Sequence, residues 1–243
     1  MSGSQRLAVG TLIAVVAGSV GFFVASHIQS PLRSIVLPAT SKTTVRTGIA
    51  SAVSQSVEPT DTLPVAKPIP ALLPDVMLVD LQGKPKALSS IKADVLLVNF
   101  WATWCAPCRH EIPMLSKLRS ENVAKGVEIV GIAVDFRADV VKYAAKMAIS
   151  YPLLIGEEAG LDAAQSFGMD PVFPFTVFSN RLRQVVALKI GELHADEADY
   201  IIARVREINA GSLGLEAARA QIGEKLRDLA AARARAKTAA KAS

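Results

Sequence analysis

The chain has 243 residues, of which 51% are hydrophobic and 20% charged, with a formal net charge of +5 and two cysteines. Two cysteines are too few for a disulfide scaffold, and they supply only half the ligands of a structural zinc site. Residues 211–243 carry a net charge of +4, which leaves only +1 for the remaining residues. The composition therefore argues against a basic, nucleic-acid-binding protein, and no metal or cofactor is expected.

The hydrophobic excess lies near the N-terminus. Residues 7–25 form a run of 19 residues without charge, in which only Thr11 and Ser19 are polar. At about 1.5 Å per residue this run nearly spans a hydrocarbon core of roughly 30 Å. A cleaved secretory signal is the competing interpretation, because residues 24–26 resemble a cleavage site. We expect a membrane anchor, or a signal segment, over residues 1–29.

Residues 30–74 have the composition of a linker. They hold seven of the 13 prolines and twelve Ser or Thr, and no aromatic residue. Such a segment buries too little apolar surface to offset the entropy of ordering it. We therefore expect a tether, then a folded domain over residues 75–210. The basic tail, residues 211–243, is predicted to be an Ala-rich helix that frays in its basic end. A solvated tail is preferred over a partner helix or a contact with anionic lipid.

Hydrophobic patterning predicts alternating strands and helices between residues 75 and 210. Strands are expected at 75–80, 95–100, 128–134, 151–155, 175–178 and 184–189. Helices are expected at 106–120, 138–148, 161–167 and 195–209. The last two strands would pair antiparallel around residues 179–183. This order predicts an α/β domain with a central mixed sheet flanked by helices.

Both cysteines lie in one segment, WATWCAPCR at residues 101–109, directly after an apolar strand. A Cys-x-x-Cys turn that caps a helix brings the sulfurs within bonding distance and points the first at the helix N-terminus. Free N–H groups and the helix dipole there stabilise a thiolate and lower the pKa of the first cysteine. We therefore expect Cys105 to be the nucleophile and Cys108 the resolving thiol, with Ala106 and Pro107 as the active-site turn.

The segment FWATWCAPCRHEIP, with the strands LLVNF and EIVGIAVD on either side, resembles one family of proteins. This is the membrane-anchored TlpA/ResA-like branch of thioredoxin-fold thiol–disulfide oxidoreductases, and the resemblance covers roughly residues 70–210. It implies a thioredoxin-like fold with a cis-proline facing the cysteines, for which Pro174 is the candidate. Phe173 would offer backbone hydrogen bonds to an extended substrate, and Trp104 is a candidate substrate-facing residue beside the nucleophile.

Differences from classical thioredoxin refine this expectation. Asn99 stands where classical thioredoxin has a buried aspartate, which favours the TlpA-like branch. Ala106 and Pro107 lack the histidine of strongly oxidising relatives, which favours a reductant. Residues 179–183 replace the usual acidic residue and glycine of the last hairpin, so the type of that turn stays open.

By resemblance, such a reductant would lie in the inner membrane, with its catalytic domain in the periplasm. The few Lys and Arg residues that flank the apolar run do not decide the side, whereas substrate disulfides persist in the periplasm. Its substrates would be protein disulfides in cytochrome c maturation or in copper-site assembly of respiratory oxidases. Its electrons would come from a membrane thiol transporter.

Two alternatives remain open: a thiol oxidase of the same fold, and a copper-binding or copper-delivery module that uses both thiolates. A purely structural disulfide is disfavoured, because closing so small a loop constrains the unfolded chain little. Among neighbouring residues, His110 is predicted to be a solvated helix residue rather than one that tunes the thiol. Asp135 is predicted to be a helix N-cap rather than an acid–base group.

Overall fold

The computed structural model describes residues 68–242. The predicted anchor and most of the predicted linker lie outside the described residues. Among the helices of residues 68–242, none combines the length and the apolar character needed to cross a membrane.

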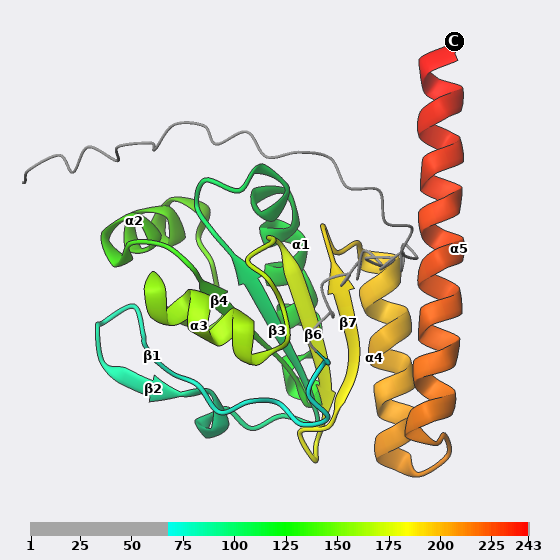
Figure 1. The fold of residues 1–243 in the computed structure, drawn as a ribbon, viewed down its shortest axis with the longest axis horizontal. Helices are drawn as coiled ribbons and strands as arrows, with labels where there is room; N and C mark the ends of the chain where they lie inside the picture. The colour runs from blue at the N-terminus through cyan, green and yellow to red at the C-terminus, as the bar shows by residue number, and fades with distance from the viewer. Residues whose placement is uncertain (1–67, 243) are drawn as a thin grey trace, which may run out of the picture. The chain divides into compact units, whose positions relative to one another are not determined.

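The described domain is built on a mixed sheet of seven strands, in the order β2-β1-β5-β4-β3-β6-β7 (Figure 1). The strands are β1 Met77–Val79, β2 Pro85–Ala87, β3 Val95–Trp101, β4 Val127–Ala133, β5 Leu153–Ile155, β6 Phe175–Asn180 and β7 Val185–Ile190. Central β3 pairs in parallel with β4 and antiparallel with β6. The mixed sheet predicted from the sequence is therefore confirmed.

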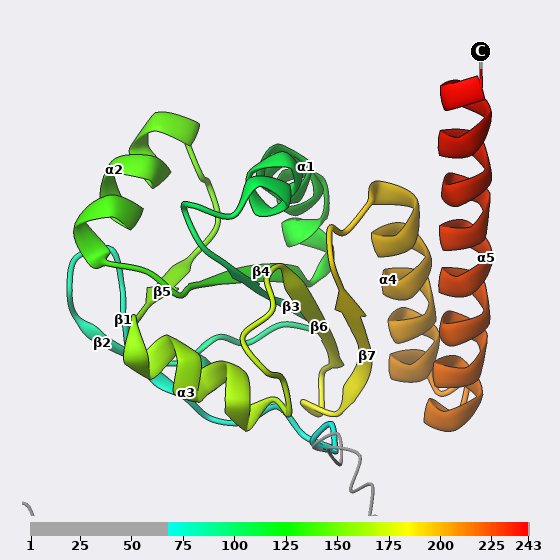
Figure 2. The same ribbon diagram turned by 45° about the horizontal axis from the view of Figure 1, so that its top comes forward.

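Helices cover both faces of this sheet. They are α1 Ala106–Asn122, α2 Arg137–Met147, α3 Glu158–Ser166, α4 Ala195–Ala210 and α5 Leu215–Ala242, with short 3-10 turns at Leu88–Ser90 and Val123–Lys125. Residues of α1, α2 and α4 share one core cluster, whereas α3 packs into the cluster on the opposite face (Figure 2).

Strand β3 shows why its sequence is apolar without interruption. Val95, Leu97 and Trp101 point into the cluster beneath α1, and Leu96 and Phe100 point into the cluster that holds α3. Because successive side chains of a strand alternate between its faces, a strand covered on both sides needs apolar residues at nearly every position. This burial fixes the end of β3, from which the two cysteines follow.

The first strands differ most from the prediction. The strand expected at 75–80 shortens to β1, and β2 was not predicted, because three residues give too short a pattern to identify. The domain also includes residues before residue 75. Leu72 forms an isolated bridge with Gln184, and the N–H of Leu73 donates to the carbonyl of Arg183 at 2.8 Å. The last residues of the predicted linker therefore pair with the hairpin between β6 and β7.

The C-terminal segment forms one helix of 28 residues, and it stays helical to Ala242. The predicted Ala-rich helix is therefore confirmed, and alanine, arginine and lysine are all strong helix formers. Its first half packs against α4 and β7 and buries Ala218 and Ile222. The helix is thus a packed part of the domain over this half.

Candidate active site

Cys105 and Cys108 form a disulfide at the N-terminus of α1, with their Cα atoms 5.3 Å apart. Cys105 is the N-cap of the helix, and its Sγ accepts the backbone N–H of Cys108 at 3.3 Å. Cys105 is 5% exposed, whereas Cys108 is completely buried. A partner molecule therefore reaches the sulfur of Cys105 first. This sulfur already accepts an N–H that has no acceptor within the helix.

Asp135 fixes the loop that carries the first cysteine. Its Oδ2 accepts the N–H of Thr103 at 3.0 Å and the hydroxyl of Thr103 at 2.6 Å. Its Oδ1 accepts the N–H of Phe136 at 2.8 Å. The N-cap of α2 is Phe136, which makes no side-chain cap. The prediction of Asp135 as a helix N-cap is therefore wrong, because its carboxylate ties β4 to the cysteine loop instead.

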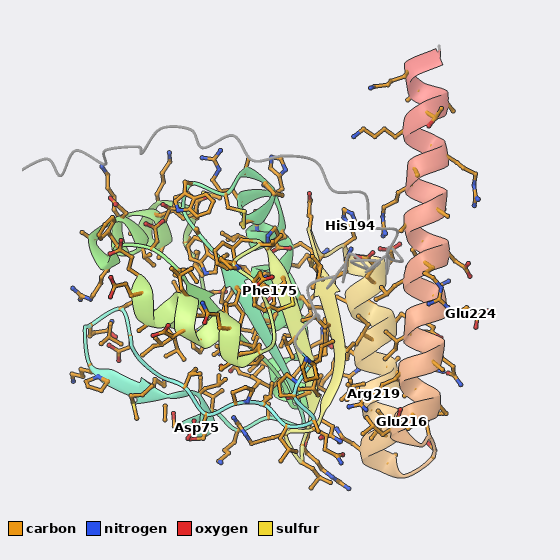
Figure 3. All side chains as sticks on the ribbon, in the orientation of Figure 1. Asp75, Phe175, His194, Glu216, Arg219 and Glu224 are labelled. Atoms are coloured by element: carbon orange, nitrogen blue, oxygen red, sulfur yellow. A yellow bond between two sulfur atoms is a disulfide. The ribbon has the colours of Figure 1, made fainter. Side chains whose placement is uncertain are left out.

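The residues predicted to bind substrate gather beside the cysteine loop. The peptide bond between Phe173 and Pro174 is cis, as expected, and it lies just before β6. Trp104 is 67% exposed, and the centroid of its ring lies 6.1 Å from that of the Phe173 ring. Phe173 in turn stacks at 6.3 Å on Phe175, which Figure 3 places in the middle of the domain. An aromatic row thus runs from solvent beside Cys105 into the core.

An open cleft of about 570 Å³ adjoins this aromatic row. Trp104, Phe173, Phe136 and Leu161 supply its apolar surface, and its lining also includes Asp139 and Glu157. Because Trp104 and Phe136 are exposed, the cleft offers apolar surface to a polypeptide segment beside the disulfide.

Glu111 is a site residue that the sequence did not reveal. It lies on α1 one turn beyond Cys108, and only 1% of its surface is exposed. Its Oε2 accepts the N–H of Leu193 at 2.7 Å, and its Oε1 accepts Nδ2 of Asn99 at 2.8 Å. Burial raises the pKa of Glu111 to about 7, although these two hydrogen bonds act in the opposite direction. An acid that titrates near neutrality therefore lies one helical turn from the cysteine pair.

Asn99 links this acid to the sheet. Its Nδ2 also donates to the hydroxyl of Thr176 at 3.0 Å, so the amide joins α1 to β6. The sequence held a signal for the burial of Glu111, since it shares a helix face with Cys108, Ile112 and Leu115 at spacings of three and four residues. A glutamate within an otherwise buried stripe is the pattern that could have identified it.

His110 lies on the outer side of the same helix. Its side chain is exposed, and Nδ1 is 4.0 Å from Oε2 of Glu192. The prediction of a solvated helix residue is confirmed. Over residues 68–242, no group of three or more His, Cys, Asp or Glu residues is arranged to hold a metal ion.

Residues 69–188 match the model of the AhpC/TSA family. The chain is 30% identical over 116 residues to the thiol-disulfide oxidoreductase ResA of Halalkalibacterium halodurans, covering 47% of this chain and 64% of that protein. It is 31% identical over 133 residues to ResA of Bacillus thuringiensis subsp. konkukian, covering 54% of this chain and 75% of that protein.

A solved structure of a thiol:disulfide interchange protein of the thioredoxin family from Chlorobium tepidum is also similar. It is 28% identical, covers 58% of this chain and 99% of its own, and superposes with a TM-score of 0.50. The fold is therefore thioredoxin-like, as expected. Together with the Cys-x-x-Cys disulfide at the start of α1, these similarities show that the chain belongs to the TlpA/ResA-like family of thiol–disulfide oxidoreductases.

Proposed function

We propose that this oxidoreductase reduces disulfide bonds in other proteins, with Cys105 as the nucleophile and Cys108 as the resolving thiol. The observation that carries the proposal is the disulfide at the N-terminus of α1, in which the more accessible sulfur belongs to the helix N-cap. In the reduced protein, the same N–H groups and the helix dipole would stabilise the Cys105 thiolate.

The thiol–disulfide exchange takes place in two steps. The Cys105 thiolate attacks a substrate disulfide, forms a mixed disulfide and releases one substrate thiolate, which takes up a proton. Cys108 then loses its proton, attacks Sγ of Cys105 and releases the second substrate thiolate, which also takes up a proton. Overall, two electrons pass from the protein to the substrate, and of the two protons taken up by the substrate thiolates one is balanced by the proton of Cys108 and one comes from solvent. Glu111 lies one turn from Cys108 with a pKa of about 7, so it is our candidate to accept the proton that Cys108 loses.

The substrate would be a polypeptide segment held beside Trp104. The exposed Trp104 ring, the Phe173 ring and the adjoining cleft provide apolar surface, and the backbone of Phe173, before cis-Pro174, would hydrogen-bond to an extended chain. A flexible segment that carries its disulfide into this cleft fits better than a disulfide buried in a folded protein.

The direction of electron flow and the cellular setting belong to the same proposal. The Ala106–Pro107 turn without a histidine supports a reductant over an oxidase. By resemblance, its setting is cytochrome c maturation or copper-site assembly, with a membrane thiol transporter as electron donor. Residues 7–25 would anchor the chain in the inner membrane, with the catalytic domain in the periplasm.

Trapping of the mixed disulfide tests the chemistry. In a Cys108→Ser chain the complex between Cys105 and its substrate cannot be resolved, so covalent complexes with protein partners should accumulate. The matched Cys105→Ser variant should trap none. Tight binding of Cu(I) by the native chain, with no trapped partner, would contradict the proposal and favour the copper module.

The direction of transfer has its own measurement. Alkylation of thiols in intact cells reports how much of the Cys105–Cys108 pair is reduced. A reductant should be held largely reduced by its donor, whereas a largely oxidised pair would instead favour the oxidase.

A further inference from the structure

Helix α5 is longer than the surface it packs against. It has 28 residues and the neighbouring α4 has 16, so their lengths are about 42 Å and about 24 Å. The two helices are joined by a short loop and pack side by side. Arg233 of α5 donates to Asp196 and Glu197 in the first turn of α4. Residues 234–242 therefore extend beyond the end of α4, as Figures 1 and 2 show.

This extension begins at the edge of the domain that carries the disulfide. The N-terminus of α4, marked by His194 in Figure 3, follows the loop from β7. In that loop, Glu192 approaches His110 on the active-site helix, and the N–H of Leu193 donates to buried Glu111. The base of the extension is thus connected through one loop to the helix that bears both cysteines.

The extension is basic and exposed on all sides. Every residue from 234 to 241 is exposed, and Arg235, Lys237 and Lys241 have no ion pair within the described part of the chain. Arg233 pairs with Asp196 and Glu197, and Glu197 also pairs with Lys189; the last acidic residue of the sequence is Asp228. The three cations beyond Arg233 therefore make the extension itself positively charged.

The charges exceed what the helix itself needs. A cation in the last turn stabilises the helix dipole, which accounts for Lys241. Arg235 and Lys237 lie further from the end, where the dipole effect has faded. Their charges are therefore available to attract another molecule.

A protein fits this surface better than a lipid bilayer. No bulky apolar residue follows Leu229, so the extension has no face that would insert between lipids. Basic segments that bind anionic membranes by charge alone usually carry about four to eight cations close together. Three cations are few for that purpose, yet enough to guide an acidic protein towards a nearby site.

The cleft on the other side of the active site has two acidic residues in its lining. Asp139 and Glu157 line the cleft beside Trp104, near α2 and α3, whereas α5 lies beyond β7 at the other edge of the sheet. Charge separation of this kind orients a partner as well as attracting it. The acidic region of the partner would face α5.

We propose that residues 234–241 form a docking arm that recruits an acidic protein partner to the Cys105–Cys108 disulfide. This inference rests on the proposed exchange of thiols and disulfides, and it adds the charge of the partner and the surface that recognises it.

The test compares charge reversal on the arm with the same reversal elsewhere. The arm variant is Arg235→Glu, Lys237→Glu and Lys241→Glu in the full chain. The control reverses three exposed cations at the opposite end of the sheet: Lys92→Glu, Lys125→Glu and Arg181→Glu. Both variants have the same net charge, so a difference between them reports the position of the charges.

The probes are two synthetic peptides with the same disulfide loop, one with a tail of eight glutamates and one with eight serines. Such a tail reaches about 26 Å when extended. The measured quantity is the second-order rate constant for reduction of each peptide by the reduced protein, at low salt and at about 0.5 M salt. Binding of each protein to phosphatidylglycerol vesicles is measured in parallel.

We expect the arm variant to reduce the glutamate-tailed peptide about tenfold more slowly than the native protein at low salt. The difference should vanish at high salt, and the control variant and the serine-tailed peptide should show none. Equal losses in both variants, or no loss in either, would overturn the docking arm. So would vesicle binding that depends on the arm without any change in the peptide rates.

The two proposals fail in distinguishable ways. If the native protein does not reduce the serine-tailed peptide, the proposed function fails and the docking arm fails with it. If it reduces both peptides at rates that the arm variant leaves unchanged, only the docking arm fails.

Discussion

Glu111 makes the stability of this protein depend on pH in an unusual direction. Burial raises its pKa from 4.5 to about 7 in the folded protein, while an unfolded chain leaves it near the ordinary value. Between these values the folded state binds more protons than the unfolded state. The free energy of unfolding therefore falls as the pH rises through this window, and the loss is complete above the folded pKa.

The magnitude follows from the shift. One pKa unit corresponds to about 1.36 kcal/mol, so a shift of about 2.5 units should cost about 3 kcal/mol between pH 4.5 and pH 8. A Glu111→Gln variant does not titrate and should lose this component. Its amide also presents an NH₂ group to Asn99 or to the N–H of Leu193, at a pH-independent cost of about 1–3 kcal/mol.

Chemical unfolding of the oxidised proteins in guanidinium chloride measures both effects. The difference between native and Glu111→Gln unfolding free energies should shift by about 3 kcal/mol in favour of the variant from pH 4.5 to pH 8. The matched control is Glu121→Gln, an exposed position near the other end of α1, which should follow the native protein. Parallel pH profiles for native protein and Glu111→Gln would refute the reasoning.

Three further changes test the packing around the site by the same unfolding assay. Asp135→Ala removes the acceptor of three hydrogen bonds and should cost about 3 kcal/mol, whereas Asp139→Ala, exposed on α2, should cost at most about 1 kcal/mol. Gly131→Ala would place a Cβ 2.6 Å and 2.9 Å from core side chains and should cost about 2–3 kcal/mol, whereas Gly214→Ala meets open space and should be nearly neutral. Arg233→Ala removes one of two cations paired with a buried glutamate of α4 and should cost about 1–2 kcal/mol.

Each of these predictions has an outcome that contradicts it. Equal costs for Asp135→Ala and Asp139→Ala would show that the carboxylate does not hold the cysteine loop. A neutral Gly131→Ala would mean that the core around β4 has room to relax. The control for Arg233→Ala is Arg235→Ala, at an exposed position. Equal losses of stability in these two variants would show that the ion pair with the buried glutamate is not the cause.

Much of the central fold follows from local patterns in the sequence. The helix expected at 106–120 is observed as Ala106–Asn122, and the one expected at 195–209 as Ala195–Ala210. The uninterrupted apolar run of β3 and the Cys-x-x-Cys spacing identify the strand and the turn after it. These features are local, because burial of β3 on both faces requires apolar side chains at consecutive positions, and that run is visible in the sequence.

Other features depend on contacts between distant residues. Strand β2 has three residues and is defined by its pairing with β1, which no window of sequence displays. Asp135 is 32 residues from Thr103, and only the parallel pairing of β3 and β4 brings them together. Glu111 is buried because Asn99 and the N–H of Leu193 meet it there. Such distant partners determine whether a polar side chain can be buried. They cannot be identified from the residues next to it in the sequence.

The pairing of residues 71–73 with the hairpin between β6 and β7 determines where the domain can be attached to a surface or to a fusion partner. Strand β6 has six residues, so this junction lies about 20 Å along the strand from Pro174. On its N-terminal side the chain runs antiparallel to β7, so Ile69 and Pro70 line a groove with Val186–Leu188, part of the way back towards the disulfide end. A surface or fusion partner joined directly before residue 68 therefore lies beside β7, and a spacer is needed there to keep Trp104 and the cysteine loop accessible to captured partners.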